Sequence, residues 1–211
     1  MIDRNVDSLS LTTLRRLPTY LRYFRDKSSS GVSYLSSVAI AKDMDLSPMV
    51  VKKDLAVAIL TEGKPKVGYH LESLINDIET FLGYTNKKDA VIVGVGQLGR
   101  ALMSYEGFAN YGLNIVVGFD TDETIHDVAG KKVLMMDKFT NLVSRMNIHI
   151  GIITVNKEKA QQIAEMMVKA GIKAIWNWAP VQLRLPDDIV IKQEDLAASL
   201  AELSVKLEGL L

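Results

Sequence analysis

The sequence contains no cysteine, which excludes disulfide bonds, thiol catalysis and a thiol-based redox switch. Any response to redox state would therefore need a bound cofactor. No apolar run approaches the roughly 18 residues expected of a membrane helix. The first residues are charged and lack the apolar core of a secretory signal. We therefore expect a cytoplasmic location.

Neither sign of charge is in excess, since 25 basic residues balance 25 acidic ones over 211 residues. The charges are nevertheless unevenly distributed, because residues 1–70 hold eleven basic and seven acidic residues. A basic N-terminal segment is compatible with nucleic-acid binding. The length allows one large domain or two small ones.

The most informative segment is a glycine motif between an apolar run and a helical one. Residues 90–93 precede Gly94-x-Gly96-x-x-Gly99, and a helix is expected from Gln97 to about residue 107. In this context Gly94 allows a tight turn, Gly96 lets the backbone approach a pyrophosphate, and Gly99 lets helix and strand pack closely. The free N–H groups of the helix N-terminus attract phosphates. The motif predicts a dinucleotide site.

A second β-rich run, residues 114–119, ends at Asp120. A carboxylate at this place is suited to accept the hydroxyls of an adenosine ribose. The next residues, 121–123, add acidic groups and no arginine, so a 2′-phosphate would be repelled. We therefore expect NAD(H), as NADH or NAD+, in preference to NADP(H). The same carboxylate disfavours coenzyme A, which carries a phosphorylated ribose.

Strand and helix patterns alternate after Asp120. Strands are expected over 132–135, 148–155, 174–176 and 189–191, and helices over 137–146 and 157–170. This alternation predicts an α/β fold with a doubly wound parallel sheet. Ligands bind beyond the carboxyl ends of such strands. The predicted cofactor-binding residues are Gly94, Val95, Gly96, Gln97, Leu98, Gly99, Tyr105, Asp120, Thr154, Val155 and Asn177.

The segment before the glycine motif is long enough for a small domain. Helices are expected over 9–25, with Leu14, Leu17, Leu21 and Phe24 on one buried stripe, over 35–44, from Ser47-Pro48 to about 60, and over 71–82. Residues 61–69 are expected to form a short β-ribbon. Pro18 either kinks the first helix or lies at its start. Two helices joined by a tight turn and followed by a basic ribbon indicate a winged helix-turn-helix.

The third of these helices would then enter the major groove of DNA. The alternative is a helical cap whose lysines are only solvated. On the DNA hypothesis, the contacting residues are Arg15, Arg16, Ser47, Met49, Lys52, Lys53, Lys64 and Lys66.

The last helix, expected over 194–210, carries an apolar stripe of Leu196, Leu200, Leu203, Leu207 and Leu210, widened by Ala197, Val205 and Leu211. A stripe of this kind needs a partner, which is either the chain's own sheet or a second subunit. The predicted organisation is therefore a DNA-binding domain over 1–83, a Rossmann domain over 84–193 and a dimerisation helix over 194–211.

Catalytic candidates are few. His70 lies outside the expected crevice, His126 follows Asp120 in a loop, and His149 is predicted to be a core histidine within its strand. No zinc-protease or nucleophile-elbow motif occurs, so neither a metal site nor a catalytic triad is predicted. Little chain remains for a substrate domain. A small NAD-dependent oxidoreductase and a nucleotide-binding interaction module stay as alternatives to a regulator.

With these motifs, the chain resembles the Rex family of bacterial redox-sensing transcriptional repressors. The resemblance is carried by Arg16-Leu17-Pro18-x-Tyr20-Leu21-Arg22, Lys53-Asp54-Leu55, Val67-Gly68-Tyr69, the glycine motif, Tyr105-x-Gly107-Phe108, Phe119-Asp120, Thr154-Val155, Asn177-x-Ala179-Pro180 and Asp195-Leu196. It implies a homodimeric repressor that binds operator DNA through paired winged helices and is released by NADH.

The resemblance also implies a last helix swapped between subunits. Asp195 would then alternate between Arg22 in the DNA-binding state and Tyr105 in the NADH state. The chain departs from the family pattern at Lys52, where arginine is usual, and in the wing, where Pro65-Lys66 replaces an Arg-Gly pair. Asn156 and Trp178 are further departures. These changes bear on which operator is read and on the strength of the response to NADH.

Overall fold

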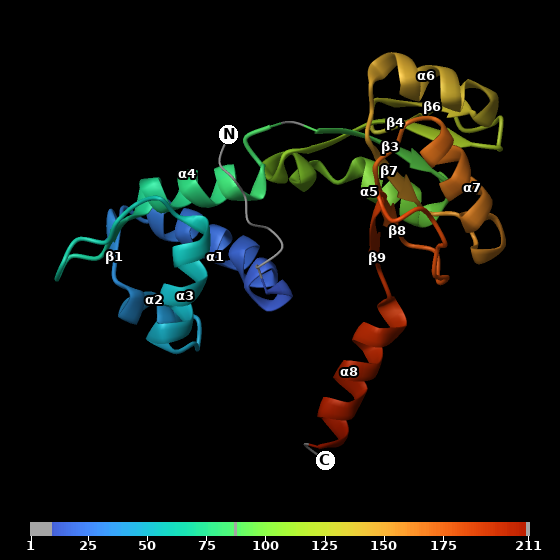
Figure 1. Cartoon of the computed structure of the whole chain (residues 1–211). Helices are drawn as coiled ribbons and strands as arrows, with labels where there is room; N and C mark the ends of the chain where they lie inside the picture. The colour runs from blue at the N-terminus through green and yellow to red at the C-terminus, as the bar shows by residue number, and fades with distance from the viewer. Residues whose placement is uncertain (1–9, 87, 210–211) are drawn as a thin grey trace. The chain divides into compact units, whose positions relative to one another are not determined.

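The computed structural model describes residues 10–86 and 88–209 (Figure 1). The chain divides into two compact units, Met1–Asn86 and Lys87–Leu211. No helix within the described residues is long and apolar enough to cross a membrane.

The first unit is helical with one small sheet. Its elements are α1 (Leu11–Ser29), β1 (Tyr34–Leu35), α2 (Ser37–Asp43), α3 (Pro48–Ala58), β2 (Tyr69–His70) and α4 (Leu71–Leu82). Serine hydroxyls cap three of the helices, because Ser10, Ser36 and Ser47 each accept a backbone N–H of the first turn. The predicted start of α3 at Ser47-Pro48 is confirmed.

The core of this unit lies between α1, α3 and α4. Leu17, Leu21 and Phe24 of α1 are fully buried, as predicted. The prediction for Leu14 is wrong, since that side chain is 37% exposed and the polar residues Thr13 and Tyr20 are buried instead. The α1 surface facing α3 is therefore partly polar.

Pro18 lies inside α1, which begins seven residues earlier at Leu11. The alternative that placed this proline at the helix start is therefore wrong. Gly83 ends α4 in the left-handed conformation, with φ of 73°, as expected for a glycine C-cap.

The wing, residues 61–68, is less regular than the predicted β-ribbon. A single bridge joins Lys64 to Gly68, and β2 pairs instead with β1, with Tyr34 opposite His70. Gly68 has φ of 99°, and a Cβ there would lie 2.3 Å from the Leu35 carbonyl oxygen. Pro65 has no N–H to donate, which limits ladder formation at the tip.

The second unit alternates strands and helices. Its elements are β3 (Lys88–Val93), α5 (Gln97–Ser104), η2 (Glu106–Tyr111), β4 (Leu113–Asp120), β5 (Asp127–Val128), β6 (Lys131–Met135), η3 (Met136–Lys138), α6 (Phe139–Met146), β7 (Ile150–Ile153), α7 (Lys157–Lys169), β8 (Ala174–Asn177), β9 (Val190–Gln193) and α8 (Leu196–Glu208).

The strands form one sheet in the order β5-β6-β4-β3-β7-β8-β9. All neighbours are parallel except β5, which pairs antiparallel with β6. The strand order reverses at β3, so the parallel strands follow the dinucleotide-binding arrangement, and the predicted doubly wound sheet is confirmed. The carboxyl ends of β3, β4 and β7 therefore lie side by side at one edge.

Each face of the sheet has its own apolar core. Phe139, Val143 and Met167, from α6 and α7, pack with one set of strand residues. Leu102 and Met103, from α5, pack with the alternate set, which includes Ile92 and Ile152. This alternation follows from the two-residue period of a strand buried on both faces.

Two details of this unit differ from the sequence predictions. The helix after the glycines ends at Ser104 and is followed by the 3₁₀ segment η2. Strand β7 begins only at Ile150, so His149 precedes it and is exposed, with Nδ1 3.3 Å from the Gly171 carbonyl oxygen. The prediction of a core histidine is therefore wrong.

Candidate functional site: a nucleotide crevice and a DNA-binding surface

A cavity of about 220 Å³ opens where the strand order reverses. It is lined by Val93, Gly94, Gly96, Asp120, Thr121, Met136, Thr154, Val155, Asn156, Lys159 and Ile163. Five predicted cofactor residues are therefore brought together: Gly94, Gly96, Asp120, Thr154 and Val155. They come from the carboxyl ends of β3, β4 and β7, where a ligand is expected.

The three glycines of the motif are required for different reasons. Gly94 has φ of +96°, and a Cβ there would lie 2.8 Å from the Thr154 carbonyl carbon. A Cβ on Gly99 would lie 2.0 Å from the Gly94 carbonyl oxygen, so this glycine allows α5 to approach the loop. At Gly96 a Cβ would meet no heavy atom within 4 Å. No contact among the described residues requires a glycine at 96, whereas a bound pyrophosphate would.

Asp120 organises the glycine loop as well as facing the crevice. One carboxylate oxygen accepts the Val95 N–H at 2.5 Å, and the other accepts the N–H groups of Thr121 at 2.7 Å and Asp122 at 3.0 Å. The carboxylate is therefore held in one orientation at the end of β4, and Oδ2, with a single bond, retains capacity to accept a hydroxyl.

Thr154 closes the crevice from the β7 side. Its hydroxyl donates to the Gly94 carbonyl at 2.6 Å, and its N–H donates to the Val93 carbonyl at 3.0 Å. These bonds join the carboxyl ends of the two central strands, which explains why the turn at Gly94 is so close to the β7 backbone.

The other predicted cofactor residues do not line this cavity. Val95 is fully buried beneath the loop, and Gln97 and Leu98 are exposed in the first turn of α5. Asn177 is fully buried, and its amide bonds to Ala179, Val181 and Gln193. Their roles toward a cofactor stay predictions.

Six of the lining residues were not among the predicted cofactor residues: Val93, Thr121, Met136, Asn156, Lys159 and Ile163. Met136 directly follows β6 and so lies at the same edge of the sheet. Lys159 and Ile163 are four residues apart on α7 and share one helix face. That spacing, beginning just after Asn156, was the available signal.

Four of the eight predicted DNA-binding residues, Ser47, Met49, Lys52 and Lys53, belong to α3 or its N-cap. Ser47 caps the helix, with its hydroxyl accepting the Val50 N–H at 3.3 Å. Met49 is 75% exposed, and Lys52 and Lys53 are exposed one turn further on. Val51, in contrast, is fully buried, so the helix is divided into a core face and an outer face.

The wing presents two further cations. The Lys64 ammonium lies 5.8 Å from the centre of the Tyr34 ring, a cation–π distance, and Lys66 is exposed with φ of +66°. Within the described residues, Lys52, Lys53, Lys64 and Lys66 make no ion pair. Their charges are available to phosphates.

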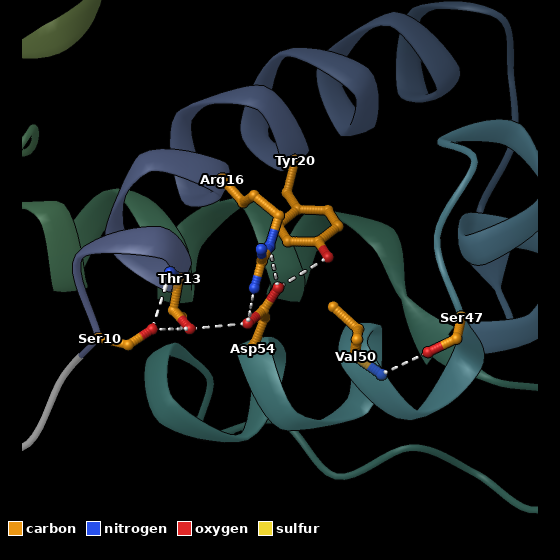
Figure 2. A network of polar contacts seen from close by, with 7 residues as sticks. All are labelled: Ser10, Thr13, Arg16, Tyr20, Ser47, Val50 and Asp54. Carbon is orange, nitrogen blue, oxygen red and sulfur yellow. Dashed lines mark hydrogen bonds and ion pairs between the residues drawn. The ribbon is translucent and has the colours of Figure 1, made fainter.

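Beneath the outer face of α3 lies a polar network built on Asp54 (Figure 2). Asp54 is 1% exposed and accepts the Thr13 hydroxyl at 2.8 Å, Arg16 Nε at 2.6 Å and Nη2 at 2.8 Å, and the Tyr20 hydroxyl at 3.0 Å. Ser10 continues the network by donating to the Thr13 hydroxyl at 2.9 Å.

The network sets the protonation of its members. Burial alone would raise the pKa of Asp54, but hydrogen bonds from Arg16, Thr13 and Tyr20 outweigh it and hold that pKa below its ordinary value. Burial, reinforced by the Asp54 carboxylate, raises the pKa of Tyr20 well above its ordinary value. The hydrogen bond to Asp54 also raises the pKa of Arg16. The pair is therefore fully charged at neutral pH.

Arg15 and Arg16 point to different environments. Arg15 is exposed on α1, whereas Arg16 is bound to Asp54 and its side chain is 28% exposed. An arginine binds a phosphate through the same guanidinium N–H donors that Arg16 already uses to bind Asp54. The DNA contact predicted for Arg16 would therefore compete with its internal ion pair.

The three residues of the implied switch are all exposed. Arg22 lies on α1, and Tyr105 follows α5; Tyr105 is 53% exposed, and its ring packs edge-on against Phe108 at 4.8 Å between ring centroids. Asp195 caps α8, with Oδ1 accepting the N–H groups of Ala197 and Ala198 at 2.9 and 3.1 Å. This cap leaves the second carboxylate oxygen of Asp195 available.

A winged helix joined to a dinucleotide-type sheet defines a class of protein, the nucleotide-responsive DNA-binding proteins. Comparison with known proteins gives the same division. A family described as a putative DNA-binding protein N-terminus matches residues 8–56, and one described as a CoA binding domain matches residues 85–181.

Two curated relatives match over nearly the full length. The redox-sensing transcriptional repressor Rex of Treponema denticola is 38% identical over 92% of this chain and 93% of its own. The Rex repressor of Bacteroides fragilis is 39% identical over 90% of this chain and 86% of its own.

Among solved structures, the Rex-family repressor RSP in complex with β-NAD+ and operator DNA matches with a TM-score of 0.89 and 31% identity, covering 95% of this chain and 93% of RSP. RSP in complex with β-NADH matches with a TM-score of 0.84 and 30% identity, covering 96% and 95%. The chain belongs to the Rex family of redox-sensing transcriptional repressors.

Proposed function

We propose that this protein represses transcription by binding operator DNA through its winged helix, and that NADH binding in the crevice releases the DNA. NAD+ would be compatible with DNA binding. Support comes from the exposed lysines of α3 and the wing, from the glycine loop and Asp120, and from RSP, which has been solved with NAD+ and operator DNA and with NADH.

The dinucleotide fits the residues of the crevice. Gly96 and the N-terminus of α5 would hold the pyrophosphate, and Asp120 would accept hydroxyls of the adenosine ribose. The bound nicotinamide supplies the redox state that is sensed. A phosphorylated ribose would face the carboxylate of Asp120 and the neighbouring Asp122, which favours NADH over NADPH and over coenzyme A.

The protein would act as a homodimer through α8, in the cytoplasm. None of the described side chains of α8 is buried, and Leu196, Leu200 and Leu203 are 62–69% exposed. An isolated helix of this length is marginal in water, so it needs a partner. A second copy of the chain is that partner, as the family resemblance implies. Leu210 and Leu211, which were expected to extend the stripe, lie outside the described residues.

Within such a dimer, Asp195 would exchange between Arg22 and Tyr105 as the cofactor state changes. The cap on α8 uses only Oδ1 of Asp195, so Oδ2 can accept from either partner without loss of the cap. Cofactor would shift this equilibrium only by binding one arrangement more tightly than the other.

The observation that carries the proposal is Gly96, a glycine that lines the crevice and meets no neighbour. The test starts with a palindromic duplex that the purified protein enriches from a random-sequence pool. Its binding is then measured at one stated salt concentration during separate titrations with NADH and NAD+. Release by NADH and not by NAD+ supports the proposal, and indifference to both contradicts it.

A further inference from the structure

Asp54 is a charged residue on the buried side of a helix whose opposite side faces solvent. Its neighbours Val51 and Leu55 on that side are fully buried, whereas Lys52 and Lys53 are exposed. A buried carboxylate is costly unless it is fully hydrogen-bonded and paired. A purely structural position would be filled more cheaply by an apolar side chain.

Both carboxylate oxygens of Asp54 accept hydrogen bonds, and all of these bonds come from α1. Oδ1 accepts from Thr13 and Arg16 Nη2, and Oδ2 accepts from Arg16 Nε and Tyr20. The donors are spaced over two turns of one face of α1, as Figure 2 shows. Rotation or sliding of α3 on α1 would break several of these bonds together, because hydrogen bonds and fork-shaped ion pairs are directional.

The apolar contacts between the same helices lack this directionality. Leu17 and Leu21 of α1 pack with Val51 and Leu55 of α3 in one core cluster. Contacts of this kind tolerate small shifts, because the hydrophobic effect is non-directional. These apolar contacts therefore restrict the orientation of α3 less sharply than the directional bonds of the carboxylate do.

We propose that Asp54, held by Thr13, Arg16 and Tyr20 of α1, is a positioning residue that sets the orientation of α3 and thereby its reading of base sequence. The inference rests on the proposed DNA-binding function. It also assigns Arg16 an inward role, through Asp54. Loss of the carboxylate would leave the lysines in place but misdirect them, so discrimination between sequences would fall more than general affinity for DNA.

The test compares Asp54→Asn with a matched control, Glu79→Gln. Glu79 accepts from Arg25 at 2.7 Å and so joins α1 to α4, in the same unit but away from α3. Full-length proteins are titrated with the enriched duplex and with a scrambled duplex of equal length and charge. The ratio of the two affinities is the readout, and loss of stability alone would not change it while the protein remains folded.

For Asp54→Asn we expect this ratio to fall about tenfold or more, the scale of a lost base contact. Affinity for the scrambled duplex and NADH binding should change by less than about twofold, because phosphate contacts and the second unit are untouched. Glu79→Gln should keep the wild-type ratio. Thr13→Val and Tyr20→Phe, which each remove one bond, should give intermediate ratios.

Hydrogen exchange of α1 and α3 peptides reports whether Asp54→Asn is folded. If it is not folded, the inference is tested with Thr13→Val and Tyr20→Phe, which each remove one hydrogen bond. A wild-type ratio in Asp54→Asn, or in both Thr13→Val and Tyr20→Phe, overturns this inference alone. A ratio that falls equally in Glu79→Gln also overturns it, because any loosening of the unit would then suffice. Wild-type protein that enriches no duplex overturns the proposed function and this inference together.

Discussion

The two units build their sites from different materials. The nucleotide crevice is a backbone site, since its glycines bring α5, β3 and β7 into close approach and Asp120 binds three backbone N–H groups. The proposed DNA-binding surface is a side-chain site, made of exposed lysines on a helix and a turn. The crevice is fixed by the local backbone geometry, whereas the surface of exposed lysines depends on the orientation of a whole helix.

This difference predicts how each site responds to mutation. In the crevice, cofactor binding and folding share residues, so most substitutions affect both. On the DNA side, the lysines that are predicted to contact DNA make no ion pair within the described structure, and the orientation of their helix is proposed to depend on Asp54 beneath them. Binding and stability should therefore be separable in the first unit and mostly inseparable in the second, with Gly96 as the exception.

The largest effect is expected for Gly99→Ala. Its new Cβ would lie 2.0 Å from the Gly94 carbonyl oxygen, a backbone atom that cannot move cheaply. We expect a loss of about 3 kcal/mol in the stability of the second unit, the upper range for overpacking, together with loss of NADH binding. Both tryptophans of the chain belong to this unit, so their fluorescence during urea unfolding measures the change.

Gly96→Ala is the matched control for that variant. Its Cβ meets no atom of the described structure, so stability should fall by no more than about 1 kcal/mol, the cost of alanine at an N-cap. NADH affinity should nevertheless fall at least about tenfold, because the methyl group occupies the place expected for a pyrophosphate. Unchanged NADH affinity in Gly96→Ala would remove the main support for the cofactor site.

The next largest effect is expected for Lys52→Ala/Lys53→Ala. Both side chains are exposed and make no ion pair within the described structure, so folding should be unchanged. Affinity for the enriched duplex should fall by about 1–3 kcal/mol per base-contacting lysine, and the slope against salt should decrease by about 1 per phosphate-contacting lysine. NADH binding, measured by tryptophan fluorescence, should stay at the wild-type value.

Lys132→Ala/Lys138→Ala removes the same charge from exposed positions of the second unit. This control separates a specific contact from a general change in net charge. If both double variants weaken DNA binding equally, α3 is not the reading helix and the winged-helix assignment of function fails.

A smaller effect is expected from acid. The pKa of Asp54 is below its ordinary value of about 3.9 in the folded protein, so its contribution to stability is complete above about pH 4 and is lost as pH falls through the lowered pKa. Hydrogen exchange of α1 and α3 peptides, corrected for intrinsic rates, should show the wild type losing its advantage over Asp54→Asn as the pH falls below 4.

Asp43→Asn is the control for the acid experiment. Hydrogen bonds from Lys27 and Tyr23 also lower the pKa of Asp43, but this carboxylate is 37% exposed and solvent screens the pair. Its removal should leave the acid response of α1 and α3 close to that of the wild type. An Asp54→Asn curve parallel to the wild type would show that the buried pair does not govern acid stability.

Much of the fold was predictable because its signals are local. The period of the α4 residues and the Ser47-Pro48 cap placed two helices correctly, and alternating segments after Asp120 predicted the sheet. The burial of Thr13 and Tyr20 was not predicted, because their partner Asp54 is more than thirty residues away in the chain. A polar residue's burial depends on such a partner, which periodicity does not reveal.

The same limit applies to the crevice. Gly94, Gly96 and Asp120 follow from a spacing rule, and Thr154 from the rule that ligands lie at carboxyl ends of strands. Lys159 was missed because its spacing from Ile163 defines a face of α7 but does not reveal what that face lines, which only the packed structure shows. Asn177 was placed at the correct strand end, but its amide turns inward to bond Gln193 at 2.7 Å.

The smallest effect, and the finest division between stability and binding, is expected at Lys66. This lysine follows Pro65 at the wing tip with φ of +66°, a conformation that suits the third position of a type II turn and favours glycine there. Lys66→Gly should stabilise the first unit by about 0.5–1 kcal/mol, since it relieves the left-handed strain at the cost of some chain entropy. It should also weaken DNA binding by the loss of one cation and reduce the slope of binding affinity against salt concentration by about 1.

Lys66→Gln is the control, because it removes the charge and keeps the strain. It should therefore weaken DNA binding without the gain in stability. If the glycine variant matches the glutamine variant in stability, the turn at the wing tip is unstrained, and its lysine is retained there for charge alone.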